Sequence, residues 1–203
     1  NQKTGVLMNF EAGDVKFIDQ NGDNIIDEKD RVVIGNPNPD LYGNIQSMLN
    51  YKNFTFSATL NYSLGNDVYN YQRSLLESGS NFYNQTMAVV NRWKYDGQVT
   101  DIPRAMSPEN EMWVNNERFS DRWIEDGSYL KLKKVRLTYE IPVNLSWLLG
   151  LSVWGEANNV FTVTKYLGND PEVSCGNSVL YQGIDAGYLP TTRNFNIGVT
   201  INL

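Results

Sequence analysis

One stretch of the chain has oxygen-bearing side chains at the spacing of a calcium-binding loop. It runs from Asp19 to Asp30, and Ca²⁺ prefers hard oxygen donors at such positions. The predicted ligands are five side chains and one main-chain carbonyl: Asp19, Asn21, Asp23, Asp27, Asp30 and the carbonyl of Ile25. The loop therefore predicts Ca²⁺ as a cofactor that stiffens the loop and takes no part in catalysis.

Two positions of this loop depart from the EF-hand pattern. Asn24 stands where glycine is usual, although asparagine tolerates a left-handed backbone. Asp30 stands where a longer, bidentate glutamate is usual. The alternative is an Asx-rich turn that closes the loop without a metal.

Aromatic residues form a second group with a possible binding role. The stretch from 65 to 126 contains three tryptophans, Trp93, Trp113 and Trp123. Aromatic rings stack on sugars or line pockets for peptide side chains. We predict that these tryptophans bind substrate, and the alternative is that they pack the loop or contact a partner protein.

The sequence contains little that would support catalysis. It has no histidine, which removes the commonest general base and the Ser-His-Asp and Cys-His arrangements. Asp170 and Glu172 form a carboxylate pair, but a glycosidase needs two carboxyl groups that flank a bond within a cleft. Nothing in the sequence indicates that this pair converges, so we do not expect an enzyme.

Composition excludes further classes of protein. Hydrophobic residues make up 41% of the 203 residues, which argues against disorder, and Cys175 is the only cysteine, so no intrachain disulfide forms. The net charge of −6 and the lack of a basic run make nucleic acid a poor partner.

The chain starts without Met or an apolar leader, so we expect it to be cut or processed from a longer protein. No run approaches the ~20 apolar residues of a membrane helix.

Several segments alternate between apolar and polar residues, as strands with two different faces do. The predicted strands are residues 41–51, 54–64, 127–141, 149–159 and 194–203. Their apolar faces run for ~9–11 residues, the length that a tilted strand needs to cross a bilayer, whereas soluble strands are usually nearer ~5–6. In the third strand we expect Tyr129, Val135 and Leu137 on the apolar face, and Lys134 and Arg136 on the polar face.

The connections between these strands alternate in length. Lys52 and Asn53 join the first two strands and residues 142–148 join the next pair, whereas long loops occupy residues 65–126 and 160–191. Outer-membrane barrels have short turns on the periplasmic rim and long loops outside. We therefore predict an all-β fold: an antiparallel transmembrane β-barrel segment of about five strands over residues 41–203, preceded by an extracellular loop over residues 1–40.

The last residues look like the carboxy-terminal signal that the barrel assembly machinery reads. Polar Asn196 and the small Gly198 are followed by apolar residues at alternate positions, ending at Ile201 and Leu203. The usual final aromatic residue is leucine here. An edge strand with free hydrogen-bonding groups offers the machinery a pairing surface.

Six motifs in order and in register resemble one receptor family. They are residues 13–23, 34–40, 101–104, 120–130, 158–162 and 168–172. Together they resemble the carboxy-terminal end of the SusC/RagA family of TonB-linked receptors. The resemblance covers nearly the whole chain.

This resemblance implies a location and partners. It implies a barrel of roughly 22 strands in the outer membrane, of which this chain would be the last part. It also implies an amino-terminal plug, energy relayed by TonB, a SusD-like surface lipoprotein as a lid, and import of oligosaccharides or oligopeptides. A segment with two open edges cannot span a membrane alone, so it needs membrane lipid and the remainder of the receptor. The competing hypothesis is a calcium-stabilised soluble β-module that binds glycans at the cell surface.

Overall fold

The computed structural model describes residues 10–110, 113–172 and 179–203. The chain forms two compact units, which we call the loop unit (Asn1–Gly35 and Tyr69–Ile124) and the sheet unit (Asn36–Val68 and Glu125–Leu203). Among the described residues, no helix is both long and apolar enough to cross a membrane.

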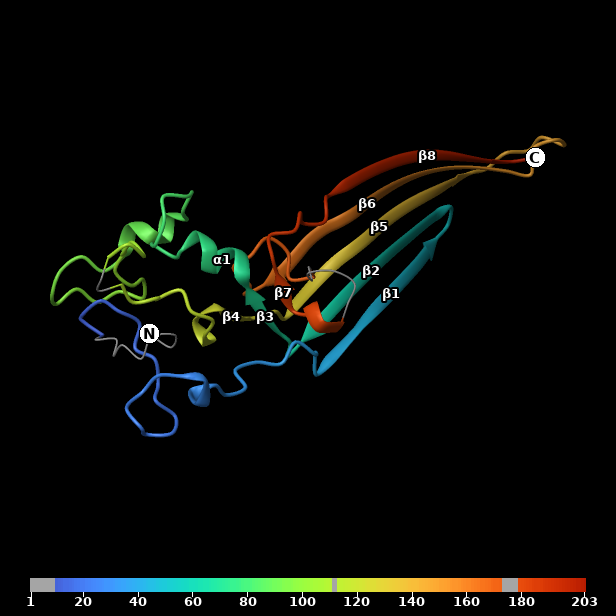
Figure 1. Cartoon of the computed structure of the whole chain (residues 1–203). Coiled ribbons are helices and arrows are strands. Elements are labelled where there is room, and N and C mark those ends of the chain that lie inside the picture. Colours follow the sequence, from blue (N-terminus) through green and yellow to red (C-terminus); the bar gives the residue numbers. More distant parts are fainter. Residues whose placement is uncertain (1–9, 111–112, 173–178) are drawn as a thin grey trace. The chain divides into compact units, whose positions relative to one another are not determined.

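The sheet unit is built on a five-stranded antiparallel sheet (Figure 1). In spatial order its strands are β1 (Leu41–Tyr51), β2 (Phe54–Leu64), β5 (Tyr129–Ile141), β6 (Gly150–Thr164) and β8 (Asn194–Asn202). Each pairs with the next of the five along the chain, which confirms the predicted all-β, antiparallel class. Strand β6 runs further than expected, to Thr164, so the loop predicted from residue 160 begins after that residue.

The remaining elements are short. A second sheet has the order β4-β3-β7 and consists of β3 (Asp67–Asn70), β4 (Ile124–Asp126) and β7 (Ile184–Asp185). The helical elements are α1 (Tyr71–Leu76) and the 3-10 turns η1 (Glu28–Asp30), η2 (Met87–Asn91), η3 (Asp121–Trp123) and η4 (Val179–Tyr181). The long loop predicted over residues 65–126 is therefore a folded segment.

The short connections of the five-stranded sheet lie at one end of it (Figure 1). Lys52, in the turn between β1 and β2, has a φ of 52°, the left-handed backbone that a two-residue hairpin needs. At the same end, Ile141 pairs with Leu151, which pairs in turn with Ile201 near the end of β8. In an antiparallel sheet, alternate connections lie at opposite ends, so the two short connections share one end, as their alternation with long ones predicts.

The two faces of the five-stranded sheet differ in chemistry. On one face, apolar pairs such as Ile45 with Leu60 follow one another along the strands. Many side chains on this face are exposed, Leu49 by 63% and Ile197 by 85%. In the described residues, the buried apolar side chains lie outside these five strands: Val68, Val89, Val114, Trp123, Leu148 and Tyr166. A soluble sheet would bury such a face under a second layer, so this exposure is typical of a barrel wall.

A β-bulge interrupts β5 at Lys133. Its neighbours Leu132 and Lys134 pair with the adjacent Leu60 and Thr59, so Lys133 has no register partner in β2. The register between β5 and β6 shifts at the same level. One extra residue in a strand changes which face the residues beyond it occupy.

The bulge corrects the predicted face of Tyr129. Continuous alternation placed Tyr129 with Val135 on the apolar face, but Tyr129 pairs with Ser63 on the polar face. Its hydroxyl donates to Glu172 over 3.3 Å. Leu130 takes the apolar position instead, because Lys133 reverses the alternation between the two halves of the strand.

Candidate functional site

The polar face of the five-stranded sheet carries two groups of charged side chains. One gathers around Lys131 and includes residues of the connection between β6 and β8. The other lies beyond the bulge and contains Lys134, Arg136 and Glu156. In a barrel, this face would line the lumen.

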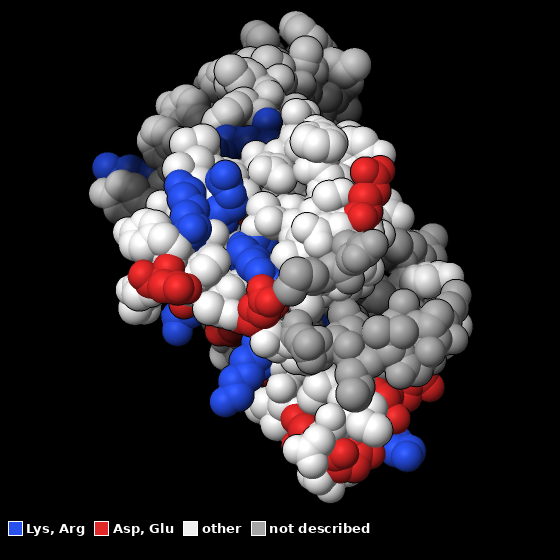
Figure 2. Space-filling model, turned by 60° about the vertical axis from the view of Figure 1, so that its left-hand side comes forward, with Lys and Arg blue, Asp and Glu red and all other residues white. Residues whose placement is uncertain are grey.

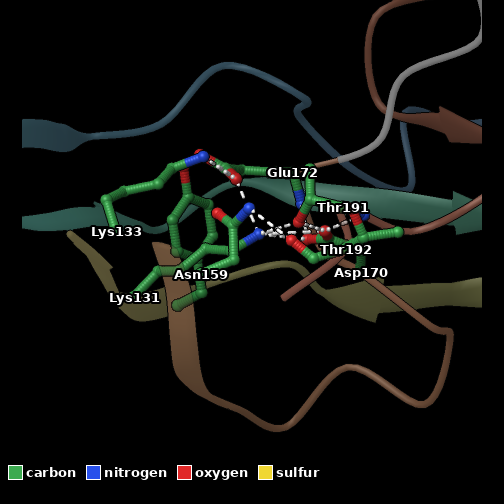
Figure 3. Close-up of polar contacts among 8 residues, drawn as sticks. Lys131, Lys133, Asn159, Asp170, Glu172, Thr191 and Thr192 are labelled. Carbon is green, nitrogen blue, oxygen red and sulfur yellow. Dashed lines mark hydrogen bonds and ion pairs between the residues drawn. The ribbon is translucent and has the colours of Figure 1, made fainter. Parts of the chain in front are cut away.

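The first group, which we call the Lys131 cluster, consists of Lys131, Lys133, Asp170, Glu172 and Thr191 (Figure 3). Nζ of the buried Lys131 lies 3.1 and 2.9 Å from the two carboxylate oxygens of Asp170. It also donates to Glu172 and to Oγ1 of Thr191, each over 2.8 Å. Lys133 reaches the same Glu172 carboxylate over 2.6 Å, so two cations face two anions.

Both carboxyl groups of the Lys131 cluster favour their charged form. Burial opposes ionisation of Asp170, but hydrogen bonds from Thr191 and Lys131 outweigh it, so the pKa of Asp170 lies below its usual value. Burial also opposes ionisation of Glu172, and hydrogen bonds from Lys131 and Lys133 lower its pKa. The cluster is therefore a closed set of ion pairs at neutral pH.

The Lys131 cluster holds both ends of the connection between β6 and β8 on the sheet. Thr191 donates to Asp170 from its backbone N–H over 3.2 Å and from its hydroxyl over 2.6 Å. Nearby, Nδ2 of Asn159 donates to the carbonyl of Thr192 over 2.8 Å. The sequence alone did not indicate whether Asp170 and Glu172 converge, and the structure brings both of them onto lysines rather than into an open cleft. Their arrangement is structural.

The second group combines ion pairs with an aromatic ring. Nζ of Lys134 lies 2.8 Å from Glu156, while Nη1 of Arg136 lies 3.7 Å from the same carboxylate. The guanidinium carbon of Arg136 is 4.1 Å from the centroid of the Trp154 ring. A Cβ atom on Gly198 would come within 2.4 Å of Cζ2 of Trp154. The missing side chain at Gly198 therefore leaves the space that the indole occupies.

The residues of the predicted assembly signal lie in and just after the edge strand β8. Asn196 pairs with Glu156 and Gly198 with Trp154 on the polar face. Ile201 and Leu203 are exposed by 58% and 77%. Reading of these residues by an assembly machinery stays a prediction, and the structure adds a local reason for glycine at position 198.

Trp123 lies in the interior of the loop unit. Its side chain is 1% exposed, with the guanidinium groups of Arg73 and Arg122 at 5.5 and 4.8 Å from the ring. Its Nε1 donates to the carbonyl of Arg118 over 3.1 Å. This ring packs the loop unit and presents no open face to cargo within the chain.

The other two predicted tryptophans are half-buried. Trp93 lies against Gly13, where a Cβ atom would come within 2.4 Å of the ring. Trp113 lines a polar crevice with Ser80, Arg104 and Glu117. Both keep exposed surface, so a role in binding cargo stays a prediction for them.

The predicted calcium loop folds as a series of Asx turns. The two carboxylate oxygens of Asp19 accept from the N–H groups of Gly22 and Asn24, each over 2.7 Å. Asp30 accepts from Gln20 and Asp27, and the hydrogen bond from Asp27 lowers the pKa of its carboxyl group. Asn24 has a φ of 62°, the left-handed backbone that asparagine tolerates. In the described parts of the chain, no three Asp, Glu, His or Cys side chains gather closely enough to hold a metal.

An ion pair joins two of the family-like motifs in the loop unit. Nε and Nη2 of Arg104 each donate to Asp14 over 2.8 Å, and the Asp14 side chain is 1% exposed. The backbone N–H of Arg104 also donates to the carbonyl of Gly13 over 2.8 Å. Residues 13–23 and 101–104 resemble the receptor family at positions that this contact brings together.

Sequence reasoning did not identify the Lys131 cluster or the pairing of Arg136 with Trp154. The available signal was the group of lysines at 131, 133 and 134 in a strand that otherwise alternates. Three cations within four positions cannot all follow a two-residue period, which indicates a bulge.

Charges of both signs share the molecular surface. Figure 2 shows acidic side chains beside basic ones on the face drawn. Nucleic-acid binding relies on a continuous basic surface that neutralises phosphates. The face drawn does not have this character.

Comparison with known proteins identifies relatives that match more than nine-tenths of the chain. No family model matches the sequence. The chain is 33% identical over 199 residues to TonB-dependent receptor P3 of Formosa agariphila, covering 94% of this chain and 19% of that protein. It is 29% identical over 198 residues to the TonB-dependent receptor SusC of Bacteroides thetaiotaomicron, covering 91% of this chain and 17% of that protein.

Solved structures agree with these relatives. The RagAB peptide transporter matches with a TM-score of 0.66 and 26% identity, over 81% of this chain and 17% of that one. The RagAB peptide importer in its closed-closed state matches with a TM-score of 0.68 and 25% identity, over 83% of this chain and 18% of that one. The chain spans about a fifth of the length of the curated relatives that it matches. In sequence and in fold, the chain is therefore related to TonB-dependent receptors such as SusC and RagA, and it matches one segment of them.

Proposed function

We propose that this segment is part of the barrel wall of an outer-membrane receptor that imports oligosaccharides or oligopeptides. The observation that carries the proposal is the contrast between the two faces of the five-stranded sheet. One face exposes apolar side chains along its strands, and the other carries ion pairs and amide side chains. Lipid suits the first face and a water-filled lumen suits the second.

The proposed receptor needs partners beyond this segment. Strands β1 and β8 lie at the edges of the sheet, and unpaired backbone groups are costly in hydrocarbon, so the remainder of the receptor would pair with them. The likeness to RagAB, a peptide importer with an open-open and a closed-closed state, supports a SusD-like lipoprotein as a lid. Energy for import would come through TonB, as the matched receptors are TonB-dependent.

We also propose that the loop from Asp19 to Asp30 binds Ca²⁺. The order of oxygen donors suits the ion, and Asn24 has the backbone that the EF-hand turn requires. Each carboxylate oxygen that now accepts a backbone N–H has a second lone pair, so ion binding need not remove these hydrogen bonds. The side chains would have to draw together around the ion.

The test of the receptor proposal is to isolate the full-length receptor that carries this segment from its native membrane in detergent. Mass spectrometry then identifies the chains and small molecules that remain with it. We expect a larger receptor polypeptide, a surface lipoprotein, and a retained oligosaccharide or peptide. A water-soluble segment that unfolds cooperatively alone would contradict the proposal and favour the calcium-stabilised glycan-binding module.

Uptake provides a second, independent readout. Cells that lack the receptor should lose growth on the nutrient identified by mass spectrometry, and the wild-type gene should restore it. Restoration should fail in cells without TonB. Unchanged growth on the nutrient after deletion of either the receptor or TonB would exclude a role of the receptor in importing it.

A further inference from the structure

We propose that Arg136 is a binding position for a carboxylate group of the imported cargo. The inference rests on the proposed function, because it requires the polar face of the sheet to line the lumen. It deepens that function by naming a chemical class of cargo, an acidic oligomer.

The guanidinium group of Arg136 retains hydrogen-bonding capacity. Its Nε donates to Oγ1 of Thr138 over a long 3.4 Å, and its Nη1 lies 3.7 Å from Glu156, beyond hydrogen-bonding distance. Its side chain is 34% exposed, so a ligand can reach it. Among the residues that the structure describes, no other hydrogen bond engages this group.

The nearest carboxylate is already satisfied by other donors. Glu156 accepts from Nζ of Lys134 over 2.8 Å and from Nδ2 of Asn158 over 3.1 Å. In the Lys131 cluster, two lysines face two carboxylates. Arg136 therefore shares the Glu156 carboxylate, at 3.7 Å, with two donors that lie closer to it.

The side chain of Arg136 is held in place before any ligand arrives. It stacks 4.1 Å from the centroid of Trp154, and the indole lies in the space left by Gly198 on the neighbouring strand. Three strands thus supply the stack: β5, β6 and β8. A guanidinium fixed in this way loses less conformational freedom when it binds a ligand.

A planar guanidinium with free terminal N–H groups matches a carboxylate through two parallel hydrogen bonds. Such a carboxylate belongs either to a peptide, at its carboxy terminus or an acidic side chain, or to a uronic acid in an oligosaccharide. The recognition chemistry is the same for both sources. The experiment has to separate them.

The test measures binding to the full-length receptor in detergent by isothermal titration calorimetry. The probes are two matched pairs: a pentapeptide as free acid and as amide, and trigalacturonate and its methyl ester. We expect the wild-type receptor to prefer the acid over the neutral partner by about tenfold in at least one pair. The pair that shows the preference identifies the source of the carboxylate.

Variants separate recognition from general charge effects. Arg136→Gln should abolish the acid preference and leave the affinity for the neutral partner unchanged. Arg136→Lys should keep only part of the acid preference, because an ammonium group lacks the two parallel N–H donors of a guanidinium. Trp154→Ala and Gly198→Ala should each reduce the preference, since both disturb the stack that holds the guanidinium. The matched control is Lys52→Gln, which removes one positive charge in the turn between β1 and β2 and should keep the full preference.

The outcomes are distinct. Equal binding of acid and neutral partners by the wild-type receptor, failure of both acids to bind, or an unchanged preference in Arg136→Gln would each overturn the inference. An unchanged preference would also show that the acid preference arises from another part of the receptor. The proposed function is judged separately by TonB-dependent uptake, which does not depend on a charged cargo.

Discussion

At the scale of single residues, the buried ammonium group of Lys131 determines how the connection between β6 and β8 is held. Its side chain is 3% exposed and contacts three residues of that connection. Removing one partner of a buried ion pair leaves an uncompensated charge, which is far costlier than the pair itself is stabilising. Lys131 is therefore the position where substitution should matter most.

We expect Lys131→Met to release the connection from the sheet. The change leaves Asp170 without its lysine and should cost about 3–5 kcal/mol of local stability. Limited chymotrypsin digestion of the full-length receptor should then cleave faster near the exposed Leu180 and Tyr181. Lys133→Met, at a more exposed position, should have a clearly smaller effect, and equal cleavage in all three proteins would contradict this role for Lys131.

The same cluster predicts a pH dependence. The pKa values of Asp170 and Glu172 in the folded protein lie below their usual values, so their pairing contributes stability above the unfolded-state pKa values of about 4. That contribution should be intact at pH 5 and should disappear as the pH falls through the lowered values. Hydrogen exchange of the amide of Thr191, corrected for the intrinsic rate at each pH, should show this loss in the wild type. The loss should be smaller in Lys131→Met, where Asp170 has no lysine partner to lose, and loss already at pH 6 in the wild type would refute the assignment.

Calcium binding is the third prediction at the residue scale. Titration of the full-length receptor with Ca²⁺ after chelation should release heat at one site, and Asp19→Ala should abolish it because the first ligand is lost. The matched control is Asp96→Ala, which removes one carboxylate elsewhere in the loop unit. Identical titrations of wild type and Asp19→Ala would leave the Asx-turn interpretation standing.

At the scale of elements, the bulge in β5 decides which residues lie on the polar face of the sheet. Lys133 is the extra residue, and it separates a half of the strand that presents Tyr129 and Lys131 from a half that presents Lys134 and Arg136. Because the side-chain period of a strand is two, the bulge allows both halves to keep charged residues on one face. It also directs Lys133 to the same carboxylate as Lys131.

Deletion of Lys133 should therefore be more harmful than its substitution. The deletion would shift one half of β5 by a residue and turn Lys131 toward the lipid face. We expect the deletion variant to assemble poorly, measured as the yield of receptor in the outer membrane, whereas Lys133→Thr should assemble at nearly the wild-type yield. Normal assembly of the deletion variant would show that the bulge can move along the strand.

At the scale of the whole molecule, the exposed apolar face is the property that separates a membrane wall from a soluble domain. Ile45, near the middle of β1, is 58% exposed on this face, and the adjacent Gln46 occupies the polar face. Two neighbouring residues thus report on two different environments. Under the proposed function, Ile45 contacts lipid and Gln46 contacts water, so a charged substitution should have different consequences at the two positions.

Arginine substitutions at these neighbours test that assignment. Ile45→Arg should destabilise the folded receptor by about 2–4 kcal/mol, because a charge at mid-bilayer depth is costly on the lipid face. Gln46→Arg should change stability by less than about 1 kcal/mol, since surface substitutions are usually small. Urea unfolding of the receptor in lipid vesicles measures both, and equal effects would contradict a lipid-facing β1.

Much of the sheet could be predicted from sequence because alternation is a local property. The bounds of β1 and β2 follow from strict alternation over Leu41–Tyr51 and Phe54–Leu64, and the turn follows from the two residues between them. The apolar face follows from the same pattern. The receptor family follows from motifs whose order and spacing are properties of the sequence alone.

Only the tertiary structure decided how distant side chains meet. Asp170 and Thr191 reach Lys131 because of the path of the connecting segment, which no periodicity encodes. Burial of Trp123 beside two arginines depends in the same way on how the loop unit folds. A pattern of period two determines which residues can share a face, but contacts between distant residues depend on three-dimensional packing, and a single bulge at Lys133 is enough to reverse the faces that the pattern predicts.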